Sequence, residues 1–140
     1  MIEKKTLGLA EAEKAVKAMI EEAAKDPRPM SVAVVDAWGN LISFARMDGA
    51  SALTARMAQN KAYTAACFSN DTRNINQWFK GAGKDVAWYD DHRLTPIHGG
   101  VCVRSGNVVV GATGTSGRHE DEALSLVGKA ALVRTTSSLT

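Results

Sequence analysis

The sequence contains few of the residues on which disulfide-rich or metal-dependent domains rely. There are 2 cysteines and 3 histidines among 140 residues. Cys67 and Cys102 stand far apart without a Cys-x-x-Cys spacing, which is typical of small buried hydrophobic residues in a reducing compartment. The histidines follow no metal-binding signature such as His-Glu-x-x-His. We therefore expect a hydrophobic core to hold the fold without disulfides or a structural metal.

Charge and hydropathy exclude further classes of protein. The 17 basic and 15 acidic side chains are interspersed and leave a net charge of only +2, so a nucleic-acid partner is not expected. No apolar run is long enough to span a bilayer, and the first residues lead into an amphipathic helix instead of an export signal. With 45% hydrophobic residues, residues 1–140 are expected to form a single cytoplasmic domain with no membrane partner.

Hydrophobic periodicity predicts helices that alternate with two strand hairpins. Apolar residues recur at helical spacing in the helical segments, whereas the strands are short and mostly apolar. The almost wholly apolar run at Met30–Val35 favours a central strand buried on both faces. The predicted helices are Leu9–Lys25, Ser51–Phe68, a short one ending at Phe79 and one over about Glu120–Val133; the predicted strand pairs are Met30–Val35 with Leu41–Met47 and Val101–Arg104 with Val108–Thr113.

Two segments have no predicted helix or strand. Lys80–Pro96 is an irregular stretch that carries Trp88 and His92 in an aromatic and acidic cluster. Loops of this length in compact domains are usually lids over a pocket or segments that contact a partner, and both alternatives stay open. Thr135–Thr140 is polar and is expected to be frayed.

Lys61 occupies an unusual position on the predicted helix Ser51–Phe68. It lies in the middle of the stripe formed by Leu53, Met57, Thr64 and Phe68. One interpretation is that its aliphatic stem packs at the core edge while the ammonium meets a carboxylate such as Asp48. The other is that the cation holds an anionic ligand group or a developing negative charge.

Glycines are concentrated between His98 and Gly117. Gly99, Gly100, Gly111, Gly114 and Gly117 indicate tight geometry or backbone exposed to a ligand. A glycine-rich bend before a helix can bind an anion, but Glu120, Asp121 and Glu122 already complement the helix dipole there. A tight turn, with the Ser116 hydroxyl stabilising it, is therefore the favoured interpretation.

Five short motifs in register resemble the GlcG/HbpS family over nearly the whole chain. No single motif is specific, but their order is. They are Val34-Val35-Asp36-x-x-Gly39-x-Leu41, Arg46-Met47-Asp48-Gly49-Ala50, Lys61-Ala62-x-Thr64-Ala65, Gly99-Gly100, and Gly111-Ala112-x-Gly114-x-Ser116-Gly117 followed by Asp121. One departure is Val101-Cys102, because the family often has proline after the paired glycines.

The resemblance implies an α+β fold, an α/β sandwich in which an antiparallel sheet of about four to five strands is flanked by helices, similar to profilin. It also implies a homo-oligomer, as a dimer or larger. The family includes haem-binding and haem-degrading sensors, the C-terminal domain of PduO-type corrinoid adenosyltransferases, an accessory protein of glycolate-use operons and a lyase acting on a hydroxylaminobenzoate. Secreted sensors of the family carry an export signal. Because one fold serves several functions in this family, the function of the chain has to be inferred from the residues of its site.

We expect a pocket for haem or a small planar or carboxylated organic molecule near the second hairpin and Lys61. Haem is the only cofactor considered, with His92, His98 or His119 as its iron ligand. The alternative is a cofactor-independent lyase, isomerase or hydrolase of a catabolic pathway; an accessory protein with a vestigial pocket is a third class. The chain has neither a Ser-His-Asp order nor a nucleotide fingerprint. The candidate catalytic residues are Lys61, His119, Glu120 and Asp48, and the candidate ligand-binding residues are Arg46, His98, Gly99, Gly100, Gly114, Ser116 and Trp88.

Overall fold

The computed structural model describes residues 1–133 as two strand hairpins, each followed by helices. The predicted frayed end, residues 135–140, lies outside the described residues. The elements are α1 (Leu9–Ala23), β1 (Ser31–Asp36), β2 (Leu41–Arg46), α2 (Ala52–Phe68), α3 (Thr72–Ala82), the 3-10 helix η1 (Val86–Tyr89), β3 (Gly100–Ser105), β4 (Val108–Ser116) and α4 (Asp121–Val133).

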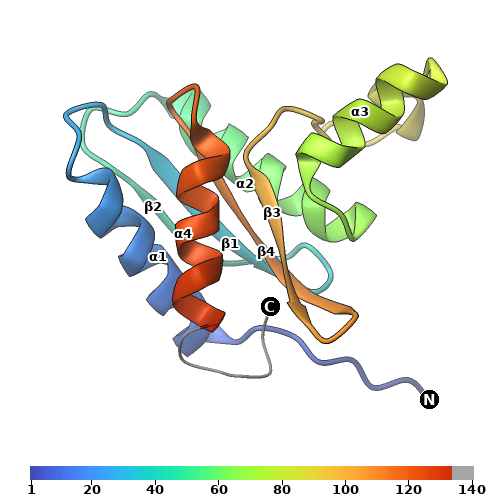
Figure 1. Cartoon of the computed structure of the whole chain (residues 1–140), viewed down its shortest axis with the longest axis horizontal. Coiled ribbons are helices and arrows are strands. Elements are labelled where there is room, and N and C mark those ends of the chain that lie inside the picture. The colour runs from blue at the N-terminus through green and yellow to red at the C-terminus, as the bar shows by residue number, and fades with distance from the viewer. Residues whose placement is uncertain (134–140) are drawn as a thin grey trace.

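The four strands form one antiparallel sheet in the order β2-β1-β4-β3. β1 is central and almost fully buried, as its apolar run predicts. Helices α1 and α4 cover one face of the sheet and α2 covers the other (Figure 1). The predicted α+β sandwich with an antiparallel sheet is confirmed, with four strands.

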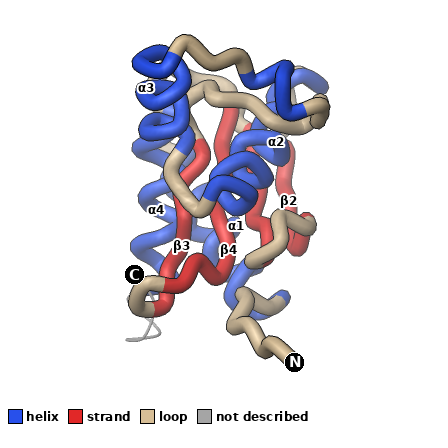
Figure 2. Tube along the Cα trace, turned by 90° about the vertical axis from the view of Figure 1, so that its right-hand side faces the viewer, coloured by secondary structure: helices blue, strands red, loops and turns tan. Residues whose placement is uncertain are grey.

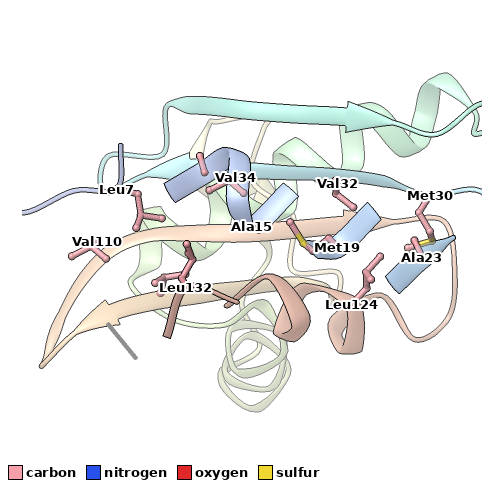
Figure 3. Close-up of a cluster of buried hydrophobic side chains, with 12 residues drawn as sticks. Leu7, Ala15, Met19, Ala23, Met30, Val32, Val34, Val110, Leu124 and Leu132 are labelled. Carbon is pink, nitrogen blue, oxygen red and sulfur yellow. The ribbon is translucent and has the colours of Figure 1, made fainter. Parts of the chain in front are cut away.

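The larger hydrophobic core lies between the sheet and the pair α1 and α4. Met19 of α1, Val32 and Val34 of β1, and Leu124 and Leu132 of α4 are all buried there (Figure 3). Alternate residues of β1 point to this face, because successive side chains of a strand point to opposite sides. The odd-numbered residues of β1 therefore face α2.

On the α2 face, small residues let the helix lie directly on the sheet. Ala58, Ala62 and Ala65 of α2 are fully buried. A Cβ atom at Gly114 would lie 2.2 Å from the carbonyl oxygen of Ala58, and one at Gly100 would lie 2.2 Å from that of Lys61. These two glycines serve helix packing, since any side chain would push α2 away.

The structure corrects three details of the sequence interpretation. β4 runs on to Ser116, so the chain bends at Gly117 rather than from Gly114. On α2 the buried residues besides Lys61 and Thr64 are alanines, and Leu53 is exposed in the first turn of the helix. Cys67, expected to be buried, is exposed on the outer side of this helix, whereas Cys102 is buried.

The predicted irregular stretch Lys80–Pro96 contains more helix than expected. α3 continues to Ala82, and η1 follows after three residues. Figure 2 shows α3 and the loop after it at the opposite end of the molecule from the N-terminal segment. Throughout residues 1–133, every helix is too short or too polar to cross a bilayer.

Replacing Gly114 with alanine should destabilise the fold, because the added methyl group would clash with the α2 backbone. We expect Gly114→Ala to lower the free energy of unfolding by about 2 kcal/mol or more, measured by urea denaturation. The matched control is Gly81→Ala in α3, where nothing lies within 4 Å of the new Cβ. That variant should be as stable as the parent or up to about 1 kcal/mol more stable. Equal stabilities of the two variants would contradict the packing argument.

Candidate functional site

A buried ion pair lies where the β3–β4 ladder ends. The Lys61 side chain is only 2% exposed, and its Nζ donates to Asp121 Oδ2 at 2.7 Å and to the Thr115 carbonyl oxygen at 3.0 Å. Lys61 belongs to α2 on one face of the sheet and Asp121 begins α4 on the other. The ion pair therefore joins the two helical layers around the end of the sheet.

Gly99 makes room for this lysine. A Cβ atom there would lie 2.9 Å from Lys61 Cδ and 3.1 Å from its Nζ, and the glycine has a positive φ of 131°. Ser125 of α4 donates from Oγ to the Gly99 carbonyl oxygen at 2.6 Å. Gly99, which the sequence predicts as a ligand-binding residue, thus leaves the space in which the Lys61 side chain extends to Asp121.

Asp121 is held by both its side chain and its backbone. Its Oδ1 accepts a hydrogen bond from the Arg118 backbone N–H at 2.9 Å, and its carbonyl oxygen accepts one from the Thr115 hydroxyl. Each carboxylate oxygen therefore has a donor, which compensates the cost of removing a charged pair from water. The bend from Ser116 to Asp121 is fixed by these contacts.

An open groove of about 510 Å³ lies against this corner. The residues that line it come from the segment between α1 and β1, from α2, from the segment before β3, from the end of β4 and from the bend into α4. They are Arg28, Met57, Lys61, Ile97, Ser116, Gly117, Arg118, His119 and Asp121. Three of these residues are cationic and one is anionic; Asp121 pairs with Lys61, and Arg28 pairs with Asp26 and Glu120 beside the groove, so the three cations face as many carboxylates.

The two arginines of the groove are anchored. Arg28 forms ion pairs with Asp26 and Glu120, and Arg118 donates to the carbonyl oxygens of Ala23 and Arg28. The hydrogen bond and ion pair between Glu120 and Arg28 keep the pKa of the Glu120 carboxyl group below its usual range. Glu120 is therefore an ionised partner of Arg28 at neutral pH and a poor proton donor.

Two polar side chains of the groove have no hydrogen-bond partner among residues 1–133. The Ser116 hydroxyl belongs to a residue that is 8% exposed, and the His119 imidazole lies exposed at the rim. Both remain able to bind a ligand. In the same part of the chain, no three His, Cys, Asp or Glu side chains are grouped to hold a metal ion.

Comparison with known proteins identifies the family of the chain. Residues 7–131 match a family model described as haem degrading protein HbpS-like. The chain belongs to the HbpS-like family. It is 33% identical to the Protein GlcG of Escherichia coli K12 over 96 residues, which are 69% of this chain and 70% of that protein.

Solved structures have the same architecture. A double mutant of HbpS from Streptomyces reticuli superimposes with a TM-score of 0.85 and 31% identity, covering 94% of this chain and 90% of the other. A structure described as a PduOC:heme complex gives a TM-score of 0.81 at 22% identity, over 90% and 94% of the two chains. The HbpS-like fold expected from the sequence motifs is confirmed.

The structure brings only some of the predicted site residues of this HbpS-like chain together. Lys61, Ser116 and His119 line the groove. Glu120 borders the adjacent hollow and pairs with Arg28. Gly99, Gly100 and Gly114 make close backbone contacts around α2, as described above. His98 precedes these glycines and is exposed, but it does not line the groove.

Arg46 and Asp48 lie farther along the same edge of the sheet. Arg46 is the register partner of Ser31, which in turn pairs with Ser116, so one strand separates Arg46 from the groove. Its guanidinium donates to the Ala50 carbonyl oxygen. Asp48 is exposed. The expected carboxylate partner of Lys61 is confirmed, but it is Asp121 and not Asp48, because the lysine passes the end of the sheet.

Trp88 and His92 are on another side of α2. Trp88 is 70% exposed in η1, and His92 follows Asp91, which accepts a hydrogen bond from the Tyr63 hydroxyl. Tyr63 and Lys61 are two residues apart on α2 and therefore face different directions. We define the Tyr63 latch as Tyr63, Asp91 and Arg93; the Arg93 guanidinium donates to the Tyr63 oxygen at 2.7 Å.

Sequence reasoning missed several residues of the site, namely Arg28, Met57, Ile97, Thr115, Arg118 and Ser125. Asp121 was noted only as an acidic residue of the first helical turn and as part of the family motif. A signal for its role was available. Within the last three family motifs, Lys61 and Asp121 are the charged residues, and their charges are opposite.

Breaking the buried ion pair should cost far more stability than breaking an exposed one. We expect Asp121→Asn to lower the free energy of unfolding by about 3 kcal/mol, because the Lys61 ammonium stays buried without its counter-charge. In the control Glu122→Gln, which breaks the exposed pair with Arg73, the loss should be under about 1 kcal/mol. Denaturant unfolding measures both. Comparable losses in the two variants would show that the buried pair has no special weight.

The Tyr63 latch should weaken at high pH. The hydrogen bond to Asp91 raises the pKa of the Tyr63 phenol above its usual value. The folded state then keeps the proton that the unfolded chain loses near pH 10, so this contribution is present below about pH 10 and is lost as the pH rises further. Relative to Tyr63→Phe, the natural chain should lose stability above that pH. Parallel curves of unfolding free energy against pH for the two proteins would contradict this.

Proposed function

We propose that this HbpS-like chain binds a small planar or carboxylated organic ligand, with haem as the first candidate, in the groove at the β4–α4 corner. The observation that carries the proposal is that one groove combines polar side chains without a protein partner and apolar walls. Ser116 and His119 supply the polar groups, and Met57 and Ile97 supply the apolar surface. The description of the family and the haem complex of PduOC support haem.

The residues of the groove fit haem as an open surface site. The His119 imidazole is exposed and has no partner within residues 1–133, so its nitrogen can bind iron. Met57 and Ile97 would contact the ring, and Arg118, whose guanidinium donates to backbone carbonyl oxygens, could pair with a carboxylate. When bound, haem would supply an iron centre with a position for an exogenous ligand.

A haemin titration of the apo-protein tests this proposal. We expect a saturable one-to-one shift of the Soret band that His119→Ala weakens at least about tenfold, because the variant lacks the axial imidazole. His92→Ala and His98→Ala are matched controls, since both histidines are exposed and neither lines the groove. Weak and unsaturable binding that is equal in all four proteins would rule out a haem site.

The alternative is a cofactor-independent enzyme that acts on a small organic acid or aromatic substrate in the same groove. The unpartnered His119 imidazole favours it, because such a group can serve as general acid or base beside the Lys61 charge. Glu120 pairs with Arg28, and Asp48 does not line the groove, so neither supports this alternative. A negative haemin titration together with binding of a small carboxylate would favour it.

We also propose that the protein acts in the cytoplasm as a homo-oligomer. Oligomerisation is supported by two exposed aromatic side chains at the α3 end of the molecule, Trp78 and Trp88, which are 48% and 70% exposed. The edge strand β2 is also only half-buried. Light scattering of the purified protein should give at least twice the mass of 14.9 kDa, and a monomeric mass would contradict it.

A further inference from the structure

We infer that the inner end of the groove is a subsite for one carboxylate group, bound by the Ser116 hydroxyl and by the remaining N–H of Lys61. This inference rests on the proposed function, because it places the ligand in the same groove. It goes further by naming the ligand class: a monocarboxylate with a flat apolar body.

Ser116 carries the first part of the argument. It ends β4, pairs in register with Ser31, and is only 8% exposed. Its side chain points to the α2 face, as that of Ser31 does when it contacts Thr54 of α2 at 3.0 Å. The Ser116 hydroxyl has no protein partner within residues 1–133, and since every fully buried side-chain oxygen or nitrogen of these residues has a partner, this hydroxyl is open to the groove that the residue lines. A ligand oxygen in the groove would satisfy it.

Lys61 supplies a second donor at the same place. An ammonium group has three N–H bonds, and two are used by Asp121 and the Thr115 carbonyl oxygen. Lys61 lines the groove although its side chain is only 2% exposed, and we assign its third N–H to a ligand at the inner end. Because Asp121 already balances much of the lysine charge, a single carboxylate should bind better than a doubly charged phosphate.

The residues around the two donors indicate that the rest of the ligand is apolar. Met57 and Ile97 flank the two donors and offer an apolar wall. The adjacent hollow of about 310 Å³ is lined by Glu22, Asp26 and Glu120 and by the cations Lys25 and Arg118. The carboxylate is placed in the groove by the donors of Ser116 and Lys61. It can come from a haem propionate or from a separate aromatic acid.

Benzoate and benzamide are probes of the same shape with and without the charge. Chemical shifts of the Gly117 backbone amide, next to Ser116, follow their binding in a nuclear magnetic resonance titration. We expect saturable benzoate binding, with benzamide at least about tenfold weaker and Ser116→Ala at least about tenfold weaker for benzoate, since a hydrogen bond to a charged group is lost.

Ser105→Ala, at the far end of β3 from the groove, is the matched control and should bind benzoate within twofold of the parent. The melting temperature of Ser116→Ala should stay that of the parent, so a binding loss reports the subsite. No saturable benzoate binding, or equal binding of benzoate and benzamide, or an unaffected Ser116→Ala variant, would each overturn the inference.

Haemin and haemin dimethyl ester separate the two sources of the carboxylate. If the group is a haem propionate, both Ser116→Ala and esterification should weaken haemin binding. If it is a separate acid, Ser116→Ala should weaken benzoate only. Haemin binding that depends on His119 with no benzoate effect would overturn the subsite and leave the proposed function standing. Benzoate binding without haemin binding would support the subsite and reject haem.

Discussion

The charge of Lys61 must be neutralised inside the protein, and much of the local architecture meets that requirement. A buried ammonium is costly unless it is paired and hydrogen-bonded. Asp121 supplies the counter-charge and Thr115 supplies a carbonyl oxygen. The start of α4 is therefore placed by a residue of α2, on the opposite face of the sheet. Because the groove is formed by these same segments, its shape depends on the ion pair.

Close packing is the second condition for this arrangement. The lysine can reach past the sheet only because α2 lies against β3 and β4 without intervening side chains. Gly100 and Gly114 provide that closeness, and the alanines of α2 match them. Gly99 then leaves a gap for the lysine stem. Glycines that look like a ligand-binding loop in the sequence thus act mainly by allowing two backbones to meet.

The sequence was a good guide to the elements and a weaker guide to their contacts. Apolar periodicity located the helices and the central strand, because burial on one or both faces leaves a local pattern. It placed Lys61 on the buried face of its helix. It did not identify Asp121 as the partner, because 60 residues separate the two and only the sheet order brings them together. The stripe predicted for this helix also included Leu53, which is exposed. Which positions of α2 face the sheet is set by the strands and not by the helix alone.

The sheet order has a consequence for the stage of folding at which a ligand could bind. Each hairpin is local, but β1 and β4 pair across about 80 residues of chain, and contacts of this kind close slowly. Met57 and Lys61 of α2 and the bend after β4 meet only once that pairing is complete. A ligand in the groove would therefore bind the finished fold and no earlier intermediate. Its binding energy would then slow the opening of the central pair of strands and protect their amides from hydrogen exchange.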